Sequence, residues 1–359
     1  MKKNLFKTLF SKNLKNRTIS YLLVFVLYIA CELLMNTGNM SSLIKSLLVP
    51  TTCYIVLALS LNLVVGISGE LSLGHAGFMC IGAFTGVCVS GLLAASITNG
   101  IVRLVIAIVI GAIISAIFGF LIGIPVLRLQ GDYLAIVTLA FCQIIKSLIN
   151  NIYFGFDKNG LQFSFIDNKL DLAEGGKTLI SGPMGATATE RISTFTVGVC
   201  LILLTLIVIY NLLYSKNGRA IMACRDNRIA AKSVGVNITN TKMLAFVLSA
   251  ALAGAAGALY GLNFSTLIPG KFDFNQSIII LVYVVLGGLG NITGTIVSTI
   301  VLYLLPELLR GLADYRMLIY AIILILIMLV TNNKKINVFV SRTKDKLKDI
   351  FRKEKRSNG

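Results

Sequence analysis

Charge and histidine are both scarce in this chain of 359 residues. Only 13% of the residues are charged and 56% are hydrophobic, whereas a soluble domain carries about 25% charged residues. The chain lacks the charge that a water-facing surface needs, so we predict an integral membrane protein. Its one histidine, His75, excludes a metal site built from several histidines and gives no recognisable His/Asp/Ser catalytic set.

Cysteine and nucleotide-binding motifs are equally uninformative. The seven cysteines are odd in number and include no C-x-x-C pair, so no disulfide framework or zinc site is predicted. Gly176-Lys177-Thr178 resembles the end of a phosphate-binding loop, but Asp171 stands where that motif needs glycine. We therefore expect no catalytic residue, no metal, no cofactor and no ATP site in this chain.

The positive charge is clustered. Of the 33 Lys and Arg residues, six lie in residues 1–17, six in Ser215–Lys242 and ten in Lys334–Arg356. Basic clusters that flank membrane spans face the cytoplasm, where anionic lipid is their electrostatic partner. No aromatic and basic surface accompanies the charge, so nucleic acid is not an expected partner.

Ten apolar segments are long enough to cross a membrane. Two basic termini on the cytoplasmic side require an even number of spans, which ten satisfies. The domains are then a basic segment 1–18, a transmembrane region 19–331 and a basic tail 332–359. A retained first span is favoured over a signal peptide, which residues 1–35 imitate. The predicted spans are 19–36, 42–66, 72–97, 101–125, 133–152, 193–214, 242–262, 276–290, 292–309 and 316–331.

Two polar loops between these spans are predicted to lie on opposite sides of the membrane. The loop 153–192 holds five acids and four bases and is predicted to be external. Residues 215–242, named the basic island here, hold six bases and one acid and are predicted to be cytoplasmic. Within the basic island, Arg225–Val234 is expected to form two to three helical turns, with breaks at Gly218 and Gly235. Such a loop is suited to docking a soluble partner.

Two segments are polar or glycine-rich where a span should be apolar. They are Ser68–Gly77 and Gly287–Gly290, and such interruptions are typical of broken helices that line a pathway. Glu70 either faces that pathway or is paired near the cytoplasmic mouth, and His75 either titrates or packs with one hydrogen bond. The predicted pathway residues are Gly69, Glu70, Ser72, Gly74, His75, Gly287, Gly288 and Gly290.

Small residues recur on one face of two other spans. Gly111, Ser115, Gly119 and Gly123 follow one another every four residues, and Ser249–Gly261 has a similar composition. Small residues let helix backbones approach closely in a membrane. We predict packing surfaces here.

Six stretches together resemble the permease subunits of ATP-binding-cassette importers for branched-chain amino acids, and most closely the second permease of the pair. They are SGELSLGHAGFMCIGAF (68–84), LRLQGDYLAIVTLAF (127–141), GRAIMACRDNRIAAKSVGVN (218–237), KMLAFVLSAALAGAAGALYG (242–261), IIILVYVVLGGLGNITG (278–294) and LLPELLRGLADYRMLIYAIILILIML (304–329). The resemblance implies an all-α permease in the cytoplasmic membrane of a bacterium. Its implied partners are a homologous permease, two ATPase subunits and an external solute-binding protein.

The same resemblance assigns the basic island to ATPase coupling. The residues so implied are Arg225, Asp226, Asn227, Arg228, Ala230, Ala231 and Gly235. The chain departs from the wider importer pattern at Ile229, where that pattern has Glu, and in the insert Phe156–Leu179. Leucine, isoleucine or valine is the implied cargo. The alternatives are another solute, such as another amino acid, urea or a sugar, or a secondary transporter that uses Glu70 and His75 for ion coupling.

Overall fold

In the computed structural model the described residues are 2–37, 40–94, 96–129, 131–157, 160–165, 176–187, 189–312 and 315–332. The predicted basic tail therefore lies almost wholly outside the described residues, as do two parts of the insert 156–179. The chain divides into two compact units, Met1–Ile300 and Val301–Gly359. The first unit holds every feature described below, apart from the end of α11, a 3-10 turn at Leu309–Leu312 and α12.

Each of the ten predicted spans corresponds to a helix, and within the described residues eight helical segments are long and apolar enough to cross a membrane. The all-α class and the count of about ten are confirmed. Several boundaries differ: the span predicted from residue 72 begins at His75, and the one predicted from 242 begins at Ile238. The helices are α1 Lys2–Asn36, α2 Ser42–Asn62, α3 His75–Leu93, α4 Gly100–Val126, α5 Asp132–Asn150, α6 Phe195–Tyr214, α9 Ile238–Gly261, α10 Phe274–Gly287, α11 Ile292–Leu308 and α12 Arg316–Asn332.

The core of the first unit forms where α3, α4 and α9 pack through small residues, as predicted. On α4, Gly111, Ser115, Gly119 and Gly123 are all buried. The Ser115 hydroxyl donates to the Ala250 carbonyl at 2.7 Å, which requires the two backbones to lie very close. In a membrane the hydrophobic effect does not drive helices together, so van der Waals contacts between close backbones stabilise their packing instead.

The opposite face of α4 is covered by branched and aromatic side chains. Val105, Val109, Ile113, Ile117 and Phe120 are each about half exposed. A helix that is apolar on its uncovered face is typical of contact with lipid rather than with water. Helix α4 therefore has a packing side made of small residues and a lipid side made of large ones.

The basic island forms two short helices, α7 Lys216–Asp226 and α8 Arg228–Ser233. The predicted boundaries were wrong. Gly218 lies inside α7, because the Ser215 hydroxyl caps that helix by accepting from the Gly218 amide at 3.1 Å. The break falls instead at Asn227, whose side chain accepts from the Ala230 amide at 3.0 Å and so starts α8. Gly235 follows α8 with a φ of 85°, as expected for a residue that ends a helix.

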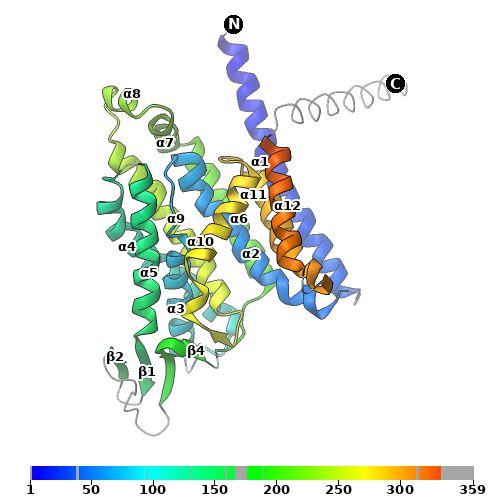
Figure 1. Cartoon of the computed structure of the whole chain (residues 1–359), viewed down its shortest axis with the longest axis vertical. Helices are drawn as coiled ribbons and strands as arrows, with labels where there is room; N and C mark the ends of the chain where they lie inside the picture. Colours follow the sequence, from blue (N-terminus) through cyan, green and yellow to red (C-terminus); the bar gives the residue numbers. More distant parts are fainter. Residues whose placement is uncertain are drawn as a thin grey trace. The chain divides into compact units, whose positions relative to one another are not determined.

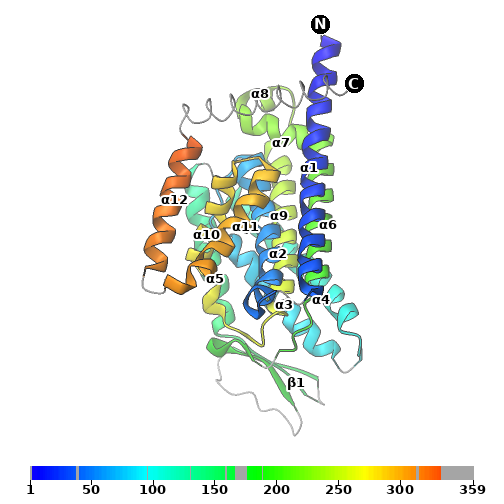
Figure 2. The ribbon, with the colours of Figure 1, turned by 90° about the vertical axis from the view of Figure 1, so that its right-hand side faces the viewer.

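The loop between α5 and α6 contains strands that the sequence did not predict. Strand β1 (Tyr153–Asp157) pairs antiparallel with β2 (Gly160–Ser164) on one side and with β3 (Lys177–Ser181) on the other. A second pair joins β4 (Ala186–Thr187) to β5 (Thr266–Leu267), which precedes α10. Figures 1 and 2 both place these strands at the end of the first unit opposite α7 and α8.

Candidate functional site

The first helix break lies between α2 and α3. Helix α2 continues into a π-helical turn, η1 (Leu63–Ser68), and the chain is then non-helical until His75. Gly69 has a φ of 74°, which the left-handed region allows to glycine at little cost. Gly74 lies so close to the Thr138 carbonyl that a Cβ would overlap it. The predicted interruption at Ser68–Gly77 is therefore present, and α5 packs against it.

Glu70 in this break forms an ion pair with Lys242 at the start of α9. The two side chains are only 13% and 8% exposed. A buried carboxylate needs a counter-charge because desolvation is expensive, and Lys242 provides it. Of the two arrangements that the sequence left open for Glu70, the paired one is observed.

His75 and Ser72 are both buried beside the same break. The His75 Nε2 atom lies 2.7 Å from the Ser60 hydroxyl oxygen, and that hydroxyl also donates to the Leu57 carbonyl. This is the packed imidazole, one of the two alternatives for His75. Within the described residues the Ser72 hydroxyl is buried and has no hydrogen-bond partner.

The second break separates α10 from α11. Helix α10 ends at Gly287, and Gly288 and Gly290 have φ angles of 91° and 79°. Gly287 packs closely on Thr295 and would clash with it if it carried a Cβ. The predicted interruption at Gly287–Gly290 is thus present as a tight turn built from glycine conformations.

Asn62, which sequence reasoning missed, brings the two breaks together. Its side-chain oxygen accepts from the Gly290 amide at 2.8 Å, and its side-chain nitrogen donates to the Thr295 hydroxyl at 2.9 Å. The residue is only 1% exposed. An amide within the apolar run 42–66 was the available signal, since a polar group inside a span is costly unless it has partners.

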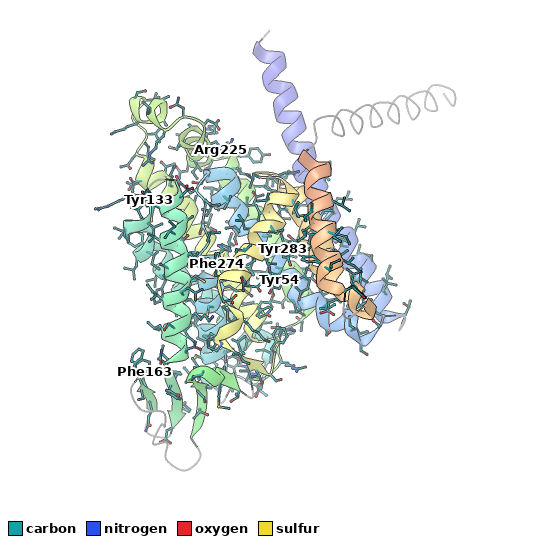
Figure 3. The ribbon with its side chains drawn as sticks, in the orientation of Figure 1. Tyr54, Tyr133, Phe163, Arg225, Phe274 and Tyr283 are labelled. Atoms are coloured by element: carbon teal, nitrogen blue, oxygen red, sulfur yellow. The ribbon has the colours of Figure 1, made fainter. Side chains whose placement is uncertain are left out.

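Arg225 at the end of α7 contacts the first break. Its Nη1 atom donates to the Gly66 carbonyl at 2.9 Å, and its Nε and Nη2 atoms donate to Asp226 at 3.1 and 3.0 Å. Gly69 packs on the Arg225 side chain. Figure 3 shows Arg225 at the α7 end of the unit. A residue assigned to coupling therefore lies directly against a residue assigned to the pathway.

Most of the other residues predicted for coupling lie on α8 and in the turn after it. Arg228 and Gly235 line a surface hollow of about 810 Å³ together with Ile229, Lys232 and Val236. Ile229 is 83% exposed and Val234 is 80% exposed. Ala230 is also exposed, whereas Ala231 is buried. Exposed branched residues flanked by positive charge are suited to a protein partner.

A polar contact between α2 and α10 was also missed. Gln276 donates to the Tyr54 hydroxyl at 2.7 Å, and the Tyr54 and Tyr283 rings meet edge to face with centroids 6.3 Å apart. Figure 3 shows Tyr54 and Tyr283 close together in the middle of the bundle. An amide and a phenol inside apolar helices satisfy each other here, which a lipid environment requires.

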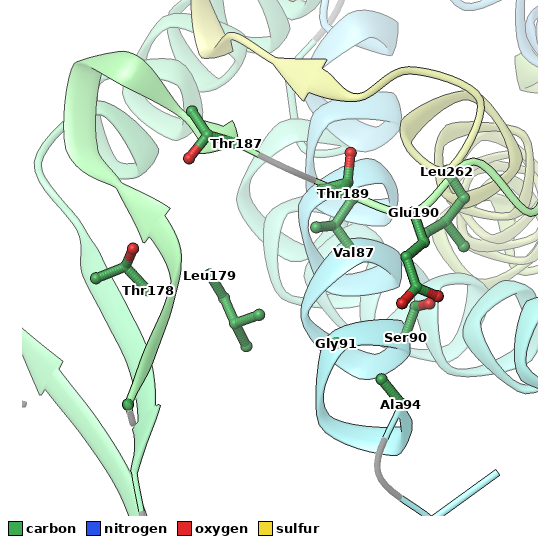
Figure 4. A pocket seen from close by; sticks show the side chains of 11 residues that line it. Val87, Ser90, Gly91, Ala94, Thr178, Leu179, Thr187, Thr189, Glu190 and Leu262 are labelled. Carbon is green, nitrogen blue, oxygen red and sulfur yellow. The ribbon is translucent and has the colours of Figure 1, made fainter. Parts of the chain in front are cut away.

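A cavity of about 380 Å³ lies at the strand end of the unit, between β3 and the end of α3 (Figure 4). Its walls come from the end of α3, from β3, from the chain before α6 and from Leu262 after α9, and they include Ser90, Thr189 and Glu190. Glu190 is ion-paired with Arg103 of α4. No sequence feature pointed to this cavity, because its walls come from four separate segments.

These features define a class of protein: a multi-pass helical membrane protein with two interrupted helices in contact, one of them bonded to a basic loop between spans. A family model described as branched-chain amino acid transport system / permease component matches residues 43–330. The chain belongs to this family.

Curated relatives agree with the family. The chain is 36% identical over 294 residues to the high-affinity branched-chain amino acid transport system permease protein LivM of Salmonella typhimurium, covering 78% of the chain and 66% of the relative. It is 35% identical over 303 residues to LivM of Escherichia coli K12, with the same shares covered. It thus spans just under two thirds of the length of these relatives. The fructose import permease FruG of Bifidobacterium longum is 24% identical over 300 residues, covering 81% of the chain and 82% of FruG. No solved structure matches the chain significantly.

Proposed function

We propose that the chain is a permease subunit of an ATP-binding-cassette importer that carries leucine, isoleucine or valine across the cytoplasmic membrane. The observation that carries this proposal is the similarity to LivM over 78% of the chain. The chain itself then catalyses no reaction, since ATP is hydrolysed by separate subunits. It provides the pathway and the surface through which those subunits act.

The partners in this proposal are a homologous permease, two ATPase subunits and an external solute-binding protein. The surface of α8, with Ile229 and Val234 exposed beside Arg228 and Lys232, supports an ATPase contact at the basic island. Apolar side chains with flanking charge are typical of protein interfaces. The external binding protein is assigned to the opposite end, at the strands of the α5–α6 loop.

The distribution of charge supports an orientation with the basic island in the cytoplasm. The basic island has six bases and one acid, and the α5–α6 loop has five acids and four bases. The first unit carries them at opposite ends (Figure 2), as a cytoplasmic and an external side would require. Figures 1 and 2 also draw the beginning of α1 at the end that carries α7 and α8, which supports a cytoplasmic N-terminus.

The mechanism in this proposal joins coupling to the pathway. Closure of the ATPases on ATP would displace α7 and α8, and Arg225 bonds α7 directly to the Gly66 carbonyl in the first break. The pathway residues Gly69, Glu70, Ser72, Gly74 and His75 follow in the same break, and Gly287, Gly288 and Gly290 form the second. Movement of the breaks would alternate access to the pathway.

An importer for another solute is the second candidate, and the similarity to FruG favours a sugar within that group. A secondary transporter is less well supported by the structure. Glu70 is neutralised by Lys242, and His75 is buried in a hydrogen bond to Ser60. Neither group is open to a coupling ion in this arrangement.

Co-purification followed by uptake tests the proposal. The tagged chain, expressed with its neighbouring subunits, should retain ATPase subunits, whereas a secondary transporter would purify without them. The complex in liposomes, with the binding protein on the outside, should accumulate radiolabelled leucine in an ATP-dependent manner. Unlabelled isoleucine and valine should compete, and fructose and urea should not. Competition by fructose alone would favour the second candidate.

A further inference from the structure

Residues 62–66, which are the last residue of α2 and the first four of η1, bond to two segments that are distant in sequence. Asn62 bonds to Gly290 and Thr295 around the second break, at 2.8 and 2.9 Å. Gly66, one turn later, accepts from Arg225 of α7 at 2.9 Å. The stretch 62–66 is therefore bonded to the second break on one side and to the basic island on the other.

The chemistry at residue 62 requires an amide. Its oxygen satisfies the Gly290 amide, and its nitrogen finds an acceptor in the Thr295 hydroxyl. An aspartate would lose the donor, and an apolar residue would leave the Gly290 amide without this partner and the Thr295 hydroxyl without its donor. An unsatisfied polar group inside a membrane is costly, because the hydrocarbon offers no replacement partner.

Gly66 makes the close approach possible. A Cβ at this position would overlap both the Asn62 side-chain oxygen and the Gly290 amide nitrogen. Gly66 also lies in the last turn of η1, where helix carbonyls have no further intrahelical donors. The Arg225 guanidinium supplies the missing donor from another element. The same glycine therefore serves the contact with the second break and the contact with α7.

We propose that Asn62 is a positioning residue that makes the two helix breaks move as one body, and that Arg225 ties this body to α7. The inference deepens the proposed function and rests on it. A displacement of α7 by the ATPases passes through Arg225 to η1, and through Asn62 to the turn at Gly288–Gly290. Without Asn62, α7 moves one break and leaves the other behind.

The test compares uptake with ATP hydrolysis in the complete importer, reconstituted with its binding protein. Asn62→Ala removes both hydrogen bonds, and Thr295→Val removes one while keeping the side-chain volume. Thr299→Val is the matched control: Thr299 lies one turn further along α11, is fully buried, and donates only to the Thr295 carbonyl at 2.7 Å. The readout is radiolabelled leucine accumulated per ATP hydrolysed.

We expect this ratio to fall at least tenfold for Asn62→Ala and threefold or more for Thr295→Val, with ATPase subunits still bound. Thr299→Val should stay within twofold of the wild type. Arg225→Gln should also lower the ratio. The ratio of the double variant Asn62→Ala/Arg225→Gln should be no lower than that of the more impaired of the two single variants. Residues in one linkage show such non-additivity, whereas independent sites multiply their effects.

Two results overturn the inference alone: a wild-type ratio in assembled Thr295→Val or Asn62→Ala complexes, or multiplied effects in the double variant. Should Asn62→Ala fail to assemble, Thr295→Val against Thr299→Val decides, since both keep the packing. A wild-type chain that neither retains ATPases nor supports uptake overturns the proposed function and this inference together. The two failures are thus distinguishable in the same preparation.

Discussion

At the first break, single residues depend on one neighbour each, either for a counter-charge or for close packing. Glu70 and Lys242 are both nearly buried and neutralise each other. Removal of one partner leaves the other charge buried and alone, which is more harmful than removal of both. The ion pair therefore changes what is expected of a mild substitution at Glu70. From the sequence alone, Glu70→Gln appears gentle because the amide keeps the size of the side chain.

We predict that Glu70→Gln destabilises the protein by about 3–5 kcal/mol, because it leaves the Lys242 ammonium without a counter-charge. The double variant Glu70→Gln/Lys242→Gln should recover most of this loss, since two amides can bond to each other. The measurement is the thermal stability of the detergent-solubilised protein, followed by the loss of its monodisperse chromatographic peak. Additive losses in the double variant would show that the two groups do not interact.

Gly74 illustrates a shape requirement at the same break. Gly74→Ala should destabilise the protein by about 1–3 kcal/mol, the usual cost of overpacking, because its Cβ overlaps the Thr138 carbonyl. Gly270→Ala is the matched control, since a Cβ there meets only Ile268 at 3.8 Å. Thermal stability distinguishes the two variants. Equal stability would mean that α5 moves away from the break without cost.

Elements differ in how well the sequence predicts them. Spans follow from long apolar runs, and the two breaks follow from glycine and polar residues inside those runs. Asn62–Gly290 and Glu70–Lys242 could not be predicted, because they join residues 228 and 172 positions apart. The limits of α7 and α8 depend on capping by Ser215 and Asn227, which outweighs the propensity of Gly218. Strands β1–β3 were missed because their pattern is short and falls in a loop.

Helix α8 and Arg225 of α7 now have separate expected roles. Arg225 bonds within the chain, whereas Arg228 borders the exposed hollow that Ile229 also lines. Arg228→Glu combined with Ile229→Asp should lower ATPase co-purification at least tenfold, because buried interface charges and apolar anchors cost about 2–5 kcal/mol when lost. Lys216→Glu is the control, being an exposed charge reversal at the other end of the basic island. Equal retention of ATPase subunits in both variants would place the docking surface elsewhere.

The whole molecule is organised by which end of the bundle carries positive charge. We predict that the basic island is cytoplasmic and the α5–α6 loop external, because positive clusters are retained on the inside. Single cysteines at Met184 and Val234, which are 68% and 80% exposed, test this in a chain whose seven native cysteines have been replaced. A membrane-impermeant maleimide should label Met184→Cys in intact cells and Val234→Cys only after permeabilisation. Six helices precede the basic island among the predicted spans, so this pattern also requires a cytoplasmic N-terminus. The reverse pattern would invert the molecule and place α8 where no ATPase could reach it.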